Sequence, residues 1–78
     1  MEDLVRYIVE NLVENKDSVE IKTEDSEKTC VLTILVNKSD IGKVIGRDGK
    51  IARSIRTIVK SASAKLNKKY IVKIGERD

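Results

Sequence analysis

The chain has 78 residues, of which 40% are hydrophobic and 37% charged, with four glycines and no proline. This composition indicates one small folded domain spanning residues 1–78 and argues against a disordered chain. A single cysteine, Cys30, and the absence of histidine exclude an intrachain disulfide and a Cys/His zinc site.

The charge is unevenly distributed along the chain. Residues 1–28 carry nine acids and four bases, net −5, whereas residues 29–78 carry twelve bases and four acids, net +8. The basic half favours a polyanionic partner, against the simpler alternative of a charged, solvated face. No signal peptide or membrane-spanning run is visible, so we expect a cytoplasmic protein without membrane contact.

The first elements predicted along the chain are a helix and a strand. Apolar residues from Leu4 to Val13 recur at helical spacing, and this helix should fade near Asn15. The segment VEIKT (19–23) alternates apolar and polar residues, which predicts a strand, and DSEK (25–28) supplies turn residues after it.

The second predicted strand is TCVLTILV (29–36), which should form a hairpin with the first. Its alternation gives a buried face of Cys30, Leu32, Ile34 and Val36. The opposite, half-covered face carries Val31, Thr33 and Leu35.

Two helices and a last strand follow. Ser39 or Asp40 is expected to cap a short helix, and a longer helix should run from about Lys50 to Leu66. On the long helix an apolar stripe is formed by Ile51, Ala52, Ile55, Ile58, Val59, Ala62 and Leu66. The strand YIVKI (70–74) would place Tyr70, Val72 and Ile74 on one side.

The element order is therefore helix, strand, strand, helix, helix, strand. The first two strands pair antiparallel, and the two-helix crossover lets the second and third lie parallel, with right-handed connection. The predicted fold is α+β, a three-stranded mixed sheet with three helices packed on one face.

The stretch VIGRDGKIA (44–52) interrupts the helical pattern with two glycines. It fits neither a Walker phosphate loop nor a dinucleotide-binding fingerprint, because the required glycine spacing is missing. Glycines permit positive φ and close approach of the backbone, and the start of the next helix attracts anions. We interpret residues 46–49 as a phosphate-approaching turn, the alternative being a plain helix-capping glycine and a flexible turn.

The segment DIGKVIGRDGKIARSIRTIV resembles the core of a KH domain, and the element order is similar to the prokaryotic, type II topology. The resemblance covers nearly the whole chain and is strongest to small bacterial single-KH proteins of the KhpA (YlqC-like) family. It implies a single-stranded RNA-binding protein, an RNA chaperone or post-transcriptional regulator acting with a second, Jag-type KH protein and linked to cell elongation and envelope regulation.

The resemblance also implies an RNA-binding site. The G-x-x-G loop of KH domains clamps about four nucleotides of backbone, and a groove beside it takes the bases by apolar contact, which needs few aromatic rings. The residues so assigned are Gly46, Arg47, Asp48, Gly49, Lys50, Arg53, Lys43, Ile41, Val44, Ile45, Ile51, Ile71 and Val72. Asp48 either weakens phosphate binding or caps the next helix, and we favour the cap. Arg56 and Lys60 are expected to point away from the groove as a solvated face.

The alternative function is a protein-interaction module that uses the same fold as a homodimer or with a second KH protein. Its surface would be the acidic first helix and the outer strand face of Val31, Thr33 and Leu35. An enzyme is disfavoured, because no histidine, nucleophile–base pair or carboxylate cluster is present in the basic half. No cofactor, metal or small-molecule substrate is expected.

Overall fold

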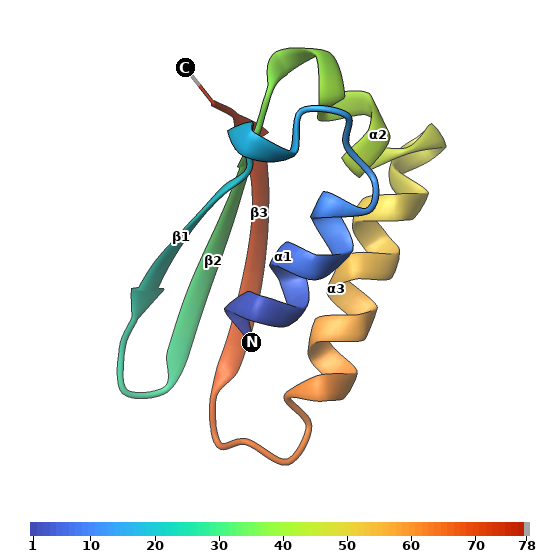
Figure 1. Ribbon diagram of the computed structural model, residues 1–78. Coiled ribbons are helices and arrows are strands. Elements are labelled where there is room, and N and C mark those ends of the chain that lie inside the picture. The colour runs from blue at the N-terminus through green and yellow to red at the C-terminus, as the bar shows by residue number, and fades with distance from the viewer. Residues whose placement is uncertain (78) are drawn as a thin grey trace.

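The helices and strands follow the predicted order in the computed structural model, which describes residues 1–77 (Figure 1). The elements are α1 (Glu2–Glu10), β1 (Glu20–Asp25), β2 (Thr29–Val36), α2 (Ile41–Ile45), α3 (Lys50–Ala62) and β3 (Lys69–Glu76). Short turns of 3-10 helix precede β1, α2 and α3.

The three strands form one mixed sheet in the order β1-β2-β3. β1 pairs antiparallel with β2, so that Ile21 lies opposite Ile34, and β2 pairs parallel with β3, so that Leu32 lies opposite Val72. Parallel neighbours need a long crossover, and α2 and α3 provide it. All three helices lie on the same face of the sheet (Figure 1), which confirms the predicted α+β fold.

The core lies between the sheet and the helices. Along β2, every second residue is buried, and these are the four that the sequence pattern placed on the inner face. α1 buries Val5 and Val9 against them, and α3 buries Ile55 and Val59. Because the same core supports α2 and α3, the turn between those two helices is held at the end of a rigid layer.

Two helices end earlier than the sequence predicts. α1 ends at Glu10 rather than near Asn15. The side-chain amide of the next residue, Asn11, donates a hydrogen bond to the Tyr7 carbonyl (2.7 Å). α3 ends at Ala62 rather than Leu66, and the hydroxyl of the following residue, Ser63, donates to the Lys60 carbonyl (3.2 Å). Polar side chains that bond the backbone locally compete with further helical turns.

The early end of α3 changes what its apolar stripe covers. Leu66 lies beyond the helix and is 50% exposed, and Ile58, at the edge of the stripe, is 42% exposed. Both were expected on the packed face, and Ser63 is buried there instead. In residues 1–77, no helix has the length and apolar character needed to cross a membrane.

Candidate nucleic-acid interface

The turn between α2 and α3 concentrates unusual backbone conformations in four residues. Gly46 has φ 76° and ψ 175°, Asp48 has φ 56°, and Gly49 has φ 74°. The turn is closed by a hydrogen bond from the Gly49 amide to the Gly46 carbonyl (3.2 Å). It therefore has a defined shape that depends on glycine at two positions.

Gly46 is constrained by its neighbours as well as by its own φ. A Cβ atom built on Gly46 would lie 2.6 Å from Cγ1 and 2.9 Å from Cβ of Ile51. At Gly49 no heavy atom lies within 4 Å of such a position. Ile51 thus packs directly beneath the backbone of Gly46, which joins the turn to the first turn of α3.

Asp48 does not cap α3, so that prediction is wrong. The residue at the cap position is Gly49, and no side chain makes a capping hydrogen bond there. Asp48 lies one residue earlier with positive φ, a conformation that aspartate tolerates better than most residues. Its presence in the turn is explained by backbone conformation, and its exposed carboxylate remains beside Arg47.

Three basic side chains surround the turn and are free of internal ion pairs. Arg47, Lys50 and Arg53 are exposed, and none forms a salt bridge with another residue between positions 1 and 77. The helix start and these cations together give the surface a positive potential. The arrangement suits a phosphate group in contact with the turn.

Lys43 differs from these three cations. Its ammonium contacts the carboxylates of Glu14 (2.9 Å) and Asp40 (3.4 Å). The hydrogen bond to Glu14, followed by that to Asp40, raises the pKa of Lys43 despite the opposing effect of its desolvation. Although the sequence assigned Lys43 to the RNA site, its charge is already balanced within the protein.

Asp40 fixes the start of α2 from inside the molecule. Its carboxylate is fully buried and accepts hydrogen bonds from the backbone amides of Glu14 (3.2 Å) and Asn15 (3.0 Å) and from the Asn15 side chain (3.0 Å). Burial alone would raise the pKa of Asp40, but these hydrogen bonds lower it to about 2. The expected helix cap at Ser39 or Asp40 is not formed, because Asn37 accepts from the Ser39 amide and Asp40 bonds the segment after α1.

The apolar residues predicted to line the groove differ in accessibility. Val44 is fully buried and Val72 is 5% exposed, so both side chains belong to the core. Ile45 is 37% exposed, and partly buried positions are occupied by Ile41, Ile51 and Ile71. The structure therefore offers fewer apolar contacts beside the turn than the sequence suggested.

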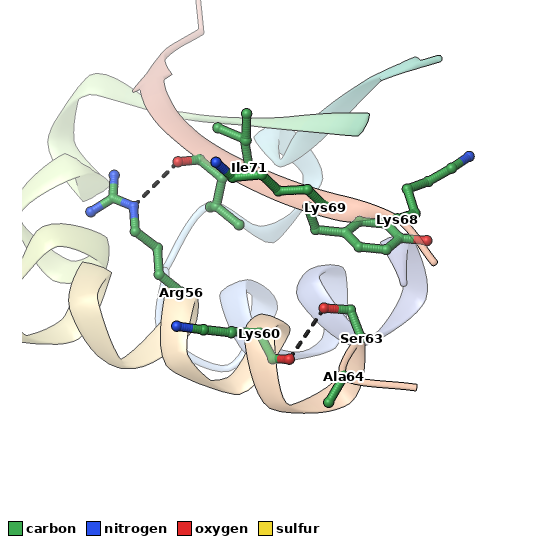
Figure 2. A pocket seen from close by; sticks show the side chains of 9 residues that line it. Arg56, Lys60, Ser63, Ala64, Lys68, Lys69 and Ile71 are labelled. Carbon is green, nitrogen blue, oxygen red and sulfur yellow. Dashed lines mark hydrogen bonds between the residues drawn. The ribbon is translucent and has the colours of Figure 1, made fainter. Parts of the chain in front are cut away.

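A hollow of about 680 Å³ lies between the C-terminal half of α3 and the first half of β3 (Figure 2). Ile71 and Val72 line it, as predicted for the strand wall, but its helical wall is formed by Arg56, Lys60 and the two residues that follow α3. The expectation that Arg56 and Lys60 point away from the groove is wrong. Arg56 reaches β3 and donates from Nε to the Val72 carbonyl (3.3 Å).

Helical spacing carries a signal that locates these two residues. Residues 53, 56 and 60 fall on one flank of α3 at about 100° per residue, beside the buried positions 52, 55 and 59. That flank faces β3, as the contact between Arg56 and Val72 shows. The sequence gives the flank but not the neighbour it faces.

This arrangement defines a class of protein. A three-stranded mixed sheet, covered on one face by three helices in the order α-β-β-α-α-β, carries a G-x-x-G turn between its last two helices. These are the features of a type II KH domain.

The chain belongs to the family described as "KhpA/KhpB, KH domain", whose sequence model matches residues 2–74. It is 40% identical over 72 residues to the "RNA-binding protein KhpA" of Borreliella burgdorferi, which covers 92% of this chain and 88% of the relative. The identically named protein of Clostridium perfringens is 42% identical over 95% of this chain and 99% of its own length. That of Bacillus subtilis is 41% identical over 88% and 85%, respectively. No solved structure gives a significant match.

Proposed function

We propose that this protein binds single-stranded RNA and that the GRDG turn holds the RNA backbone. The observation that carries the proposal is the turn itself, in which two glycines at positive φ lie beside three exposed cations. These are Arg47, Lys50 and Arg53, and none of them forms a salt bridge within residues 1–77. The names of the relatives, each an RNA-binding protein, support RNA as the ligand.

The expected binding mode is a short contact of low sequence specificity. A KH domain clamps about four nucleotides, and a site of this length gives little discrimination between sequences. Such a protein suits a role as an RNA chaperone or post-transcriptional regulator in the cytoplasm, where bacterial RNA is found. The family resemblance also implies links to cell elongation and envelope regulation. We include these links in the proposal on the basis of that resemblance alone.

The test is a salt titration of binding to short single-stranded and duplex RNA of matched sequence. If Arg47, Lys50 and Arg53 are phosphate contacts, the logarithm of the association constant should fall with the logarithm of salt concentration with a slope of roughly −2. Single strands should bind more tightly than duplex. Binding that is independent of salt, or stronger to duplex, would exclude the proposed mode.

A second candidate function is protein interaction through a homodimer or with a second KH protein of the Jag type. Val31, Leu35 and Ile71 are only partly buried on the outer face of the sheet, and Val31 lies beside Ile71 in the strand register. Apolar groups that remain accessible on a small domain favour a partner surface. The family description covers both KhpA and KhpB domains, which fits either a second copy or a relative as the partner.

Molar mass measured by light scattering at high micromolar concentration tests this candidate. A dimer that dissociates when Val31 is replaced by glutamate would support the outer face as the contact. A monomer at every concentration, together with no KH protein recovered with it from cells, would exclude the candidate.

A further inference from the structure

α2 is too short to keep its own position. It spans five residues, Ile41–Ile45, and Val44 is its only buried side chain. A helix of little more than one turn has no independent stability, because nucleation of the first turn is unfavourable. The GRDG turn follows α2 directly, so its position depends on what fixes the two ends of this helix. At the C-terminal end, the backbone of Gly46 packs on Ile51.

The N-terminal end of α2 is fixed by the carboxylate of Asp40, which is fully buried and surrounded by donors. Its Oδ1 accepts hydrogen bonds from the backbone amide of Glu14 (3.2 Å) and from Nζ of Lys43 (3.4 Å). Its Oδ2 accepts from the backbone amide (3.0 Å) and from the side-chain amide (3.0 Å) of Asn15. Three of these four donors therefore belong to the connection between α1 and β1.

The core holds that connection in place. Val13, just before the donors, and Val19, a few residues after them, are 5% and 6% exposed and belong to the hydrophobic core. A hydrogen bond from the Ser18 amide to the Asn15 carbonyl (3.0 Å) forms a turn within the connection. Figure 1 shows the connection between α1 and β1 lying beside α2. The carboxylate thus joins α2 to a segment whose own position is set by buried side chains.

Only a carboxylate satisfies this set of donors. Both of its oxygens accept hydrogen bonds, whereas the amide of asparagine has one oxygen and one NH2 group that can only donate. In either orientation of the amide, the NH2 group of an Asp40→Asn variant would face the backbone N–H of Glu14 or of Asn15. Two buried donors that face each other are both left without an acceptor, which is unfavourable.

Asp40 lies near the GRDG turn but outside any contact with a ligand there. It precedes Gly46 by six residues, which corresponds to about 9 Å along a helix axis. Its side chain is buried, so RNA bound at the turn does not touch it. Binding sites depend on supporting groups that hold the contacting residues within about 0.5 Å of their productive positions. Asp40 is placed to act in this way, because a shift of α2 at its N-terminal end would move the turn with it.

We propose that Asp40 is a positioning residue for the RNA-binding turn. Through Glu14 and Asn15 it holds α2 in the orientation in which the glycine turn and its cations contact one phosphate together. This inference rests on the proposed function and adds to it a residue that the RNA does not touch. Its consequence is that the connection between α1 and β1, far from the turn in the sequence, affects RNA affinity.

The sign of the effect separates positioning from electrostatic attraction. Replacing a carboxylate with an amide raises the net charge of the protein by one unit, which strengthens its attraction for RNA. Loss of positioning has the opposite effect, so a weaker affinity of Asp40→Asn does not follow from its charge. Asp17→Asn is the matched control for charge. Asp17 is exposed in the same connection and forms no salt bridge with any residue from 1 to 77.

Two further variants complete the set. Asn15→Ala removes one of the four hydrogen bonds to the carboxylate and lies at an exposed position, so it is the milder form of the same change. Val5→Ala leaves a cavity under α1 and is the control for a general loss of stability. Urea denaturation gives the folded fraction of each variant, so that every affinity refers to folded protein.

The test measures binding of a fluorescently labelled oligouridylate of about eight nucleotides, which covers a site of about four nucleotides. Asp40→Asn should bind about tenfold more weakly than the intact protein, as is typical when a group that orients a binding residue is lost. Asn15→Ala should bind about two- to threefold more weakly, as expected for one hydrogen bond. Asp17→Asn should bind equally or more tightly, and Val5→Ala should bind equally.

The amide signals of the glycines give a second readout, which needs no RNA. The chain has only four glycines, so their signals are readily followed in a two-dimensional ¹H–¹⁵N NMR spectrum. In Asp40→Asn, the signals of Gly46 and Gly49 should shift or broaden, because the turn is no longer held in one position. In Val5→Ala they should stay where they are in the intact protein.

The outcomes separate this inference from the proposed function. If the intact protein binds no single strand, the proposed function fails and this inference fails with it. If the intact protein binds and Asp40→Asn binds as tightly as Asp17→Asn, only the positioning role is refuted. An equal loss of affinity in Val5→Ala would also refute it, because Asp40 would then act through stability alone. If Asp40→Asn does not fold, Asn15→Ala decides: a weaker affinity supports the inference, and an unchanged affinity overturns it.

Discussion

Replacing Gly46 with alanine tests whether the turn between α2 and α3 requires glycine for two separate reasons. Gly46 has φ 76° and ψ 175°, a region that is almost exclusively occupied by glycine. The added Cβ would also lie 2.6 Å from Cγ1 of Ile51, closer than nonbonded carbon atoms approach one another. The same substitution at Gly49 meets open space and only the strain of φ 74°.

The two substitutions should therefore differ in size. At Gly46, backbone strain of about 1–3 kcal/mol adds to overpacking of about 1–3 kcal/mol, for a loss of roughly 4 kcal/mol. At Gly49, the left-handed strain of about 1–2 kcal/mol is partly offset by the lower entropy of the unfolded alanine chain, for a loss of about 1 kcal/mol. In a domain of this size, about 1 kcal/mol corresponds to roughly 4–8 °C in the melting temperature.

Urea and thermal denaturation followed by circular dichroism measure both variants. Gly46→Ala should lower the melting temperature by at least about 15 °C and Gly49→Ala by about 4–8 °C. Gly49→Asn serves as a further control, because asparagine tolerates left-handed backbone and should change stability by only a few tenths of a kcal/mol. Trimming Ile51 to alanine in the Gly46→Ala protein should cost less than the sum of the single changes. Equal losses at Gly46 and Gly49 would refute the role given to the contact with Ile51.

Three further predictions follow from the buried carboxylate, the paired lysine and the outer sheet face. Asp40 has a folded pKa of about 2 against 3.8 unfolded, so its contribution to stability is present above pH 4 and disappears as pH falls toward 2. Asp40→Asn should lower the urea midpoint at pH 7 and flatten its decline below pH 4; an unchanged midpoint at pH 7 would contradict this. Lys43→Gln should reduce RNA affinity less than Lys50→Gln, because Lys43 is already paired with Glu14; equal losses in a binding titration would show that the pair opens on binding. Leu35→Glu, on the outer face of β2, should leave RNA affinity intact but shift any dimer to the molar mass of a monomer. Loss of both RNA binding and dimer formation would show that the two surfaces overlap.

The sheet was predictable from the sequence because its signal is local. The bounds of β2 and the buried face of that strand follow from strict alternation along residues 29–36, and the structure agrees at both ends. The two outer strands extend past the ends that their sequence patterns predict. Pairing with β2 carries β1 to Asp25 and β3 to Glu76. A strand's length depends on its partner, which its own residues do not specify.

The candidate site was less predictable because it depends on contacts between distant segments. The sequence placed the two glycines in the turn correctly but suggested that Asp48 caps α3. In the structure the cap position is occupied by Gly49, whose left-handed backbone the sequence pattern does not specify. Asp40 was assigned to its own helix, whereas its partner Glu14 lies 26 residues away. Likewise, the direction of Arg56 follows from how α3 packs beside β3, and periodicity alone does not encode this.

The central claim is that the GRDG turn holds the RNA backbone, and charge reversal at Arg47 tests it most directly. Arg47→Asp should preserve the melting temperature, since exposed substitutions usually change stability by no more than about 0.5 kcal/mol. Lys16→Asp, an equal change of charge at an exposed residue outside the turn, serves as the control. We expect single-stranded RNA binding to be lost in Arg47→Asp and nearly retained in Lys16→Asp. Equal affinities for the two folded variants would contradict it, because the turn would then have no special part in binding RNA.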